Sequence, residues 1–270
     1  MVELCLDKNA FSVLQVSPRA NRDAILEAHD DRLFDGADET DVNSARARLT
    51  VNRDRITEEI TYLPELTPSK SRQILSDLLK VHSVDDAVEL IESLPNLAKV
   101  NVAAELLRRV PNEASLIEKA FTAHEQLDPC AARQSIEEAR ASSGFGTVRD
   151  EAWSDALSDL REAHAGILAG AITKTAGGPQ LLASIVGKQR PGTDGWYRTL
   201  VDKVVDRYDR WTQPHLAKIE EKLDGALSAA RATPTDPTLL KPIGEHLRAW
   251  DELRQPVQLR DQANGLDEPK

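Results

Sequence analysis

The sequence is poor in cysteine and in aromatic residues. Its 270 residues include two cysteines, Cys5 and Cys130, and aromatic side chains make up 4% of the chain. Two cysteines so far apart supply neither the ligands of a structural zinc site nor a disulfide framework. We therefore expect both to be small buried or idle thiols of a reducing compartment, which predicts a cytoplasmic protein.

Long hydrophobic runs and an excess of basic charge are also absent. No stretch approaches about 18 consecutive apolar residues, so the sequence predicts no membrane-spanning helix. The first residues, Met1 to Lys8, lack the basic and then apolar order of a secretory signal. The 34 Lys and Arg residues against 45 Asp and Glu residues give a net charge of -11. Such a balance repels phosphates, so direct nucleic-acid binding is not favoured.

What the chain does contain is the residue set of a helical protein, with Ala, Leu, Glu, Asp and Arg prominent. Apolar residues recur at helical spacing throughout, which predicts an all-α fold. Prolines and glycines divide the chain into a small helical domain, a region of short helices, a region of long helices and a loose tail. These four parts are predicted at residues 1–66, 67–148, 149–256 and 257–270.

The long-helix region carries two apolar seams with the four-and-three spacing of a coiled coil. The first runs over residues 153–171 and the second over residues 197–230, and we expect them to pair as a long antiparallel hairpin. The phase of the second seam slips by one residue beside Pro214, where a helix bond is lost. This predicts a kink or break at Pro214. A last helix is expected from about residue 238 to residue 254.

Histidine, the usual marker of metal and acid-base sites, gives no recognisable motif. The six histidines, at positions 29, 82, 124, 164, 215 and 246, include no His-Glu-x-x-His pair. His29-Asp30 is the dipeptide of helical metal-dependent phosphohydrolases, but no upstream histidine completes a metal cage, so we interpret His29 as part of a solvated helix face. His164 and His215 lie on the apolar seams and are interpreted as hydrogen-bonded core residues.

Phosphate-binding loops and paired carboxylates are no more specific. Gly144-Phe145-Gly146 lacks the third glycine of a dinucleotide loop, and Gly187-Lys188 lacks the upstream glycine of a P-loop. Lys188 and Arg190 could hold an anion, but a solvated loop is the preferred interpretation. Glu58-Glu59 and Glu137-Glu138 have the pattern of exposed helix faces. The sequence therefore predicts no catalytic residue, no metal site and no cofactor.

The N-terminal region carries a family resemblance. Residues 9–25 combine an aromatic residue, the Leu14-Gln15-Val16 step, Ser17-Pro18 and a helix that Asn21 would cap. Ala28-His29 and Leu33 continue this pattern, as do Ala45, Leu49 and the Asn52-Arg53-Asp54-Arg55 run. Over roughly residues 9–63 the chain resembles a J-domain. The resemblance implies a J-like helical fold and packing, of the kind found in co-chaperones.

Two departures from the J-domain pattern concern activity. The His-Pro-Asp tripeptide through which that family stimulates heat-shock ATPases is missing, since residues 34–41 contain neither His nor Pro. The second helix of the family is basic, but here it carries four acids against Arg22 and Arg32, and this sign would repel an acidic chaperone surface. We therefore carry over no functional residue and expect no ATPase stimulation.

These observations predict a non-catalytic, co-chaperone-like adaptor or a subunit of an intracellular protein assembly, with another protein as its partner. Candidate partner anchors are Trp196, Tyr197, Trp211 and Trp250, although core packing accounts for them equally well. An alternative from a different class is a helical enzyme or a nucleic-acid system component, with a site assembled from distant residues. Nothing in the sequence decides the oligomeric state.

Overall fold

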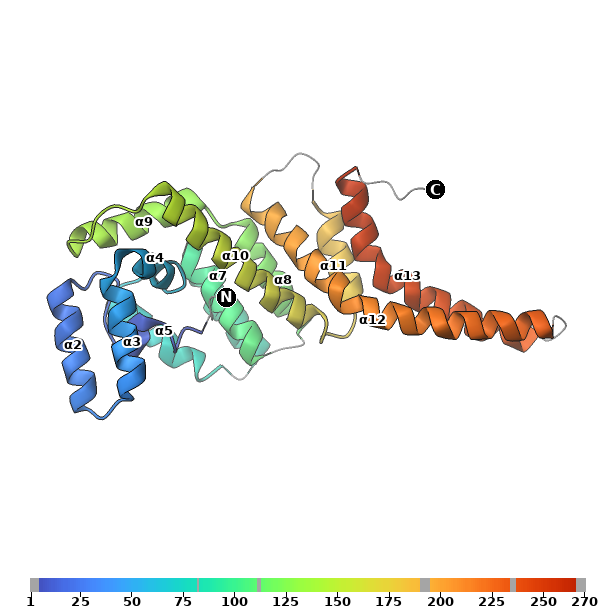
Figure 1. Cartoon of the computed structure of the whole chain (residues 1–270), viewed down its shortest axis with the longest axis horizontal. Helices are drawn as coiled ribbons and strands as arrows, with labels where there is room; N and C mark the ends of the chain where they lie inside the picture. The colour runs from blue at the N-terminus through green and yellow to red at the C-terminus, as the bar shows by residue number, and fades with distance from the viewer. Residues whose placement is uncertain (1–4, 82, 111–112, 190–194, 234–236, 266–270) are drawn as a thin grey trace. The chain divides into compact units, whose positions relative to one another are not determined.

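The computed structural model describes residues 5–81, 83–110, 113–189, 195–233 and 237–265. Within these ranges the chain forms thirteen α-helices, one short 3-10 helix and no β-strand, which confirms the predicted all-α class (Figure 1). The chain divides into two compact units, Met1–Ile167 and Leu168–Lys270. In the described ranges no helix combines the length and the apolar character needed to cross a membrane.

The first unit begins with four short helices: α1 (Ala10–Val13), α2 (Arg22–Phe34), α3 (Glu39–Thr50) and α4 (Asn52–Ile60). The predicted cap of α2 is confirmed, because Asn21 Oδ1 accepts a hydrogen bond from the Ala24 amide at 2.9 Å. Helices α2 and α3 form an antiparallel hairpin (Figure 1), and α1 packs on α3. Their shared core contains Phe11, Leu14, Ile25, Val42, Ala45 and Leu49. The J-domain resemblance of this segment stays a prediction.

Five more helices follow in the first unit, and one of them is a buried central helix. They are α5 (Pro68–Leu78), α6 (Val84–Glu92), α7 (Asn96–Arg109), α8 (Ala114–Glu125) and α9 (Pro129–Ser142). Helix α7 packs against α6, α8 and α9, and ten of its fourteen residues are buried. Because it is covered on several sides, α7 is apolar over most of its circumference rather than along one stripe. Helix α10 (Asp150–Ile172) begins in this unit, and its last five residues belong to the second.

The second unit is built on α11 (Gly178–Gly187), α12 (Trp196–Ala232), the 3-10 helix η1 (Pro237–Leu239) and α13 (Leu240–Ala263). Helix α13 packs against both α11 and α12. The Tyr208 hydroxyl on α12 donates a hydrogen bond to the Leu253 carbonyl on α13 at 3.2 Å. The core residues of this unit include Leu182, Val186, Leu200, Val201, Val204 and Val257.

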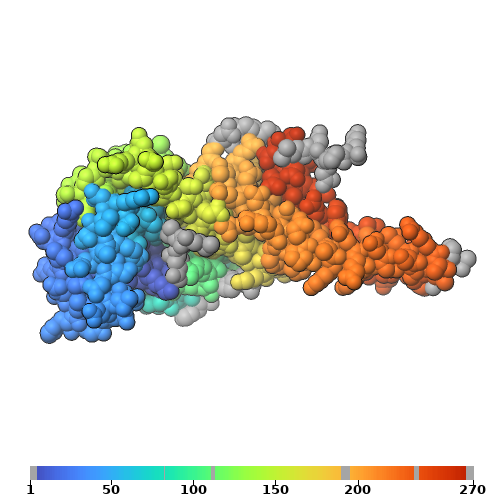
Figure 2. Space-filling model, viewed as in Figure 1, coloured from blue at the N-terminus to red at the C-terminus, as the bar shows by residue number. Residues whose placement is uncertain are grey.

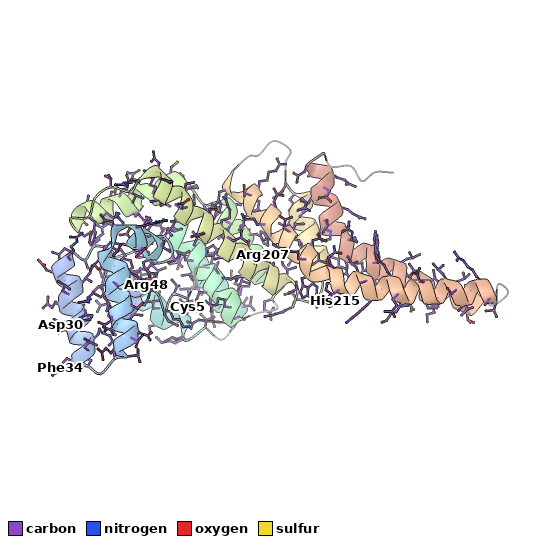
Figure 3. All side chains as sticks on the ribbon, in the orientation of Figure 1. Cys5, Asp30, Phe34, Arg48, Arg207 and His215 are labelled. Carbon is purple, nitrogen blue, oxygen red and sulfur yellow. The ribbon has the colours of Figure 1, made fainter. Side chains whose placement is uncertain are left out.

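Three expectations about the long helices need correction. The antiparallel partner of α12 is α13, not the seam over residues 153–171. Of the kink or break predicted at Pro214, the break is wrong, because α12 runs unbroken through this residue. The kink agrees with Figure 3, which shows the helix changing direction near the labelled His215. The predicted loose tail from residue 257 is wrong up to residue 263, because α13 continues through Pro256 and buries Val257. A proline removes one helix bond, and tertiary packing outweighs that loss in both helices.

The turn before α11 requires glycine at position 178. A Cβ atom there would lie 2.1 Å from the Ile172 carbonyl oxygen, which belongs to backbone that cannot rotate away. We expect Gly178→Ala to lower the free energy of unfolding by about 1–3 kcal/mol.

Gly225→Ala is the matched control, because its Cβ would meet no atom within 4 Å in the middle of α12. That control should raise the stability by about 0.5–1 kcal/mol. Urea unfolding followed by circular dichroism measures both, and equal midpoints for the two variants would contradict the steric argument.

Candidate functional site

The outer parts of α12 and α13 form a helix pair that is not covered by other elements of its unit. We call residues 217–232 and 240–255 the arm. None of these residues is buried, whereas the core of the unit reaches Leu216 on α12 and resumes at Pro256 on α13. At 1.5 Å per residue each arm helix is about 24 Å long. Figures 1 and 2 show the two helices side by side along this stretch, with no third helix drawn over them in this view.

The two arm helices meet along a heptad-like seam. Its residues step by four and three along each helix: Ile219, Leu223, Ala226 and Ala230 on α12, and Ile243, His246, Trp250 and Leu253 on α13. Every one of them is only half-buried. Two helices cover each other from one side alone, so this seam stays open along its flanks. The arm therefore has apolar surface that its own unit does not bury.

Two leucines with at least half of their surface exposed add to this open surface. Leu240 and Leu247 are 66% and 50% exposed. They lie one heptad apart on α13, about 10 Å along the same face of the helix. Burying two such side chains removes them from water at a gain of about 1 kcal/mol each. Leu240 and Leu247 are therefore the strongest apolar contacts that the arm can offer.

The structure separates the four aromatic residues that the sequence nominated. Trp196 is buried and Tyr197 half-buried at the start of α12, away from the arm. Trp250 lies in the arm seam, where its Nε1 donates a hydrogen bond to Glu220 Oε1 at 3.2 Å. Trp211 is 41% exposed, with its ring centroid 4.5 Å from that of His215. Of the four, Trp211 has the most accessible ring, and a partner-binding role for any of them stays a prediction.

Charge distinguishes the arm from the chain as a whole. The arm carries six basic residues, Lys218, Lys222, Arg231, Lys241, Arg248 and Arg254, and six acidic ones, Glu220, Glu221, Asp224, Glu245, Asp251 and Glu252. Six minus six gives a net charge of zero, in a chain of net charge -11. Long-range repulsion therefore does not oppose the approach of another protein to this surface.

The first unit contains a buried ion network that the sequence did not predict. Glu58 and Glu59, expected on an exposed face, are both buried, and Glu59 has no exposed surface. Glu59 accepts hydrogen bonds from Arg55 Nε at 2.6 Å and from Arg140 Nη1 at 2.7 Å. Arg55 and Arg140 are themselves 0% and 2% exposed. Burial raises the pKa of Glu59, and the attraction of Arg140 and Arg55 acts against that shift.

The remaining donors of the two arginines hold loops together. Arg55 Nη2 donates to the Pro18 carbonyl at 2.7 Å, and Arg140 Nε donates to the Gly146 carbonyl at 2.9 Å. The Arg55 guanidinium lies over the Phe145 ring, with Arg55 Cζ 3.8 Å from the ring centroid. Burial lowers the pKa of Arg55, and Glu59 opposes this. The network has the geometry of a structural clamp, because both arginines donate to Glu59 and to loop carbonyls.

Two histidines form a second buried polar pair. The rings of His124 on α8 and His164 on α10 are 4.9 Å apart and nearly perpendicular. His164 is a core residue as predicted, but within the described part of the chain neither of its ring nitrogens has a hydrogen-bond partner. Burial lowers the pKa of His164 to about 3, and burial followed by repulsion from His164 lowers the pKa of His124 well below its usual value. Both rings are therefore neutral near pH 7.

Two other histidines differ from their predicted environments. His29 is buried rather than solvated, with Nδ1 2.8 Å from Asp30 Oδ1 and Nε2 2.9 Å from Asn43 Oδ1. Its position between two helices explains this, because α3 covers the face of α2 that carries it. His215 is exposed rather than in the core, because it lies on the outer face of α12, whereas its neighbours Thr212 and Leu216 are buried.

The remaining clusters lack the completeness of a catalytic or metal site. Cys5, Asp7 and Glu105 form the one group in the described residues with three potential metal ligands close together. Arg109 already pairs with Asp7 at 2.5 Å and with Glu105 at 2.7 Å, so both carboxylates of this group are engaged. Cys5 is half-buried and Cys130 exposed, and both are free thiols. Arg190, one of the two residues of the candidate anion loop, lies outside the described residues.

A cavity of about 440 Å³ lies between α4 and the start of α10. Arg53 and Arg149 line it together with Glu151 and Asp155, so its charges are of both signs. Its described lining residues include no histidine and no cysteine, so they contain no catalytic pair of the His-based or Cys-based kind. Comparison of the chain with protein-family models, with curated proteins and with solved structures gave no significant match.

Proposed function

We propose that this chain is a non-catalytic adaptor, or a subunit of a protein assembly, that docks onto another protein through the arm. The observation that carries the proposal is the exposure of Leu240 and Leu247 on a helix pair without a single buried residue. Apolar surface that its own fold does not cover is the usual mark of a site of protein interaction.

The shape of the arm favours a helix as the docking element. The half-buried seam between α12 and α13 is open on its flanks, and a third helix laid along it would bury Ile243, Leu247 and their neighbours. When a helix binds in such a groove, its apolar residues at helical spacing make the main contacts, and few charged contacts are needed. The net charge of zero on the arm agrees with such a contact.

The proposal includes a co-chaperone-like role for the N-terminal segment, without stimulation of a heat-shock ATPase. Residues 34–41, where the resemblance would place the His-Pro-Asp tripeptide, contain neither His nor Pro. They include the loop of residues 35–38 that connects α2 to α3 at the tip of the hairpin. The segment would then support an assembly by binding rather than by activating an ATPase.

Affinity purification from the native cell tests the proposal. We expect the full chain to retain at least one partner protein, and the Leu240→Ser/Leu247→Ser variant to lose it, because polar side chains remove the apolar contact. Leu79→Ser is the matched control, since Leu79 is 64% exposed in the first unit. Quantitative mass spectrometry compares the three eluates. Equal recovery of every protein with all three forms would contradict docking through the arm.

A further inference from the structure

Helix α2, the loop after it and the first turn of α3 together carry the densest charge of one sign in the chain. We call residues 22–41 the acidic hairpin. Its eight carboxylates, all on exposed residues, are Asp23, Glu27, Asp30, Asp31, Asp35, Asp38, Glu39 and Asp41. Its two basic residues are Arg22 and Arg32. Two minus eight gives a net charge of -6, which is more than half of the -11 of the whole chain.

These carboxylates are not neutralised within the structure. Among the described residues, the one contact between them and a basic side chain joins Asp30 to His29 at 2.8 Å. The two arginines are directed elsewhere: Arg22 lies over the Phe145 ring, and Arg32 Nε donates to the Val13 carbonyl at 3.1 Å. The acidic hairpin therefore keeps a strong negative field at its surface.

An apolar side chain stands in the middle of this field. Phe34, the last residue of α2, is 93% exposed, and Leu26, two turns earlier on the helix, is 44% exposed. Leu26, Asp30 and Phe34 follow one another at intervals of four residues, so they lie along one side of α2. Figure 3 shows Asp30 and Phe34 on the side of α2 that faces away from α3. Aromatic residues, phenylalanine among them, are enriched in the buried centres of protein interfaces.

We propose that the acidic hairpin is a docking surface for a lysine- and arginine-rich segment of a partner protein, which places an apolar side chain against Phe34 and Leu26. The unpaired carboxylates attract such a segment and fix its register, and the two apolar residues supply the desolvated contact. The same charge repels nucleic-acid phosphates and anionic membranes. The partner is therefore a basic polypeptide.

This surface is independent of the arm. It lies in the first unit, it is acidic rather than neutral, and it would remain if the arm bound nothing. The two surfaces would allow the chain to hold one protein at each. Their tests use different variants, so the failure of one proposal leaves the other standing.

A labelled peptide of lysine and leucine, with leucines at helical spacing, is a suitable probe for the full chain. We expect fluorescence anisotropy to show binding that weakens as salt increases. Two further probes separate the contributions: in one, serine replaces every leucine, and in the other, glutamate replaces every lysine. The serine peptide should bind more weakly, and the glutamate peptide should not bind.

Variants locate the binding. Glu27→Lys/Asp31→Lys changes two exposed acids on α2 and should weaken binding of both lysine peptides by about tenfold or more. Phe34→Ser should weaken the leucine-containing peptide several-fold and leave the serine peptide unchanged. The matched controls are Glu221→Lys/Asp224→Lys on the arm and Leu79→Ser on the first unit, and both should bind as the unaltered chain does. All the changed side chains are exposed, and circular dichroism checks that each variant is folded.

Three results would overturn the inference. One is the absence of binding by the unaltered chain. Another is an equal loss of binding in the arm control, which would show attraction to the net charge of the chain rather than to the acidic hairpin. The third is a dimer in sedimentation that Phe34→Ser converts to a monomer, because a second copy would then occupy the surface.

Discussion

Replacing Glu59 with glutamine should lower the free energy of unfolding by about 3–5 kcal/mol, because two buried guanidiniums lose their counter-charge. Glu59 accepts hydrogen bonds from both Arg55 and Arg140, and none of the three has more than 2% of its surface exposed. Glutamine has nearly the same shape, so the change removes charge without creating a cavity. Urea unfolding followed by circular dichroism gives the shift in midpoint.

The matched control for this substitution is Glu27→Gln. Glu27 is an exposed glutamate on α2, and its replacement should change stability by no more than about 0.5 kcal/mol. Hydrogen exchange should place the loss of protection in the first unit, where the network connects α4 to α9. If Glu59→Gln unfolded at the same urea concentration as Glu27→Gln, the ion network would not stabilise the fold.

Acidification from pH 7.5 to 5.5 should lower the free energy of unfolding by about 1.4 kcal/mol through His164, and further through His124. Both folded-state pKa values are lowered by burial, that of His164 to about 3, whereas an unfolded histidine titrates near its usual pKa of 6.5. Below that pH these two histidines are protonated in the unfolded chain and stay neutral in the folded chain. The stabilisation is therefore complete above pH 6.5 and is lost as the pH falls from 6.5 toward 3.

The double variant His124→Leu/His164→Leu isolates this contribution. Leucine has a similar volume and does not titrate, so the slope of stability against pH over this interval should become much shallower. At pH 7.5 the double variant should be at least as stable as the unaltered chain, because the two nitrogens of His164 lack partners. Identical pH slopes in the two proteins would show that the buried pair is not the cause.

Local signals in the sequence were sufficient for the fold class and for several helix ends. The Asn21 cap and the apolar spacing of α12 have causes within a few residues, and the structure has both. Other features depend on what packs against them. Glu58-Glu59 has the pattern of an exposed pair, but Arg55 and Arg140 enclose Glu59 from α4 and α9. Arg140 is distant in the sequence, so no local pattern could pair the two.

The candidate site shows the same limit. Leu240 and Leu247 fit a heptad as well as Ile243 and Trp250 do, and the sequence cannot tell which pair faces α12. The structure places Ile243 and Trp250 in the seam and leaves the two leucines exposed. The tryptophans were candidate partner anchors because of their residue type alone, yet Trp196 packs in the core. The exposure of Phe34 could not be predicted from the sequence either, because a single aromatic residue at the end of a helix forms no periodic pattern.

Photo-crosslinking from the arm in the native cell tests most directly whether this surface binds another protein. A photoreactive amino acid at position 247 replaces an exposed leucine, and the same amino acid at position 79 serves as the control. We expect a discrete adduct between the chain and a different protein from position 247, and none from position 79. No adduct from position 247, or an adduct between two copies of this chain alone, would contradict the proposed adaptor function.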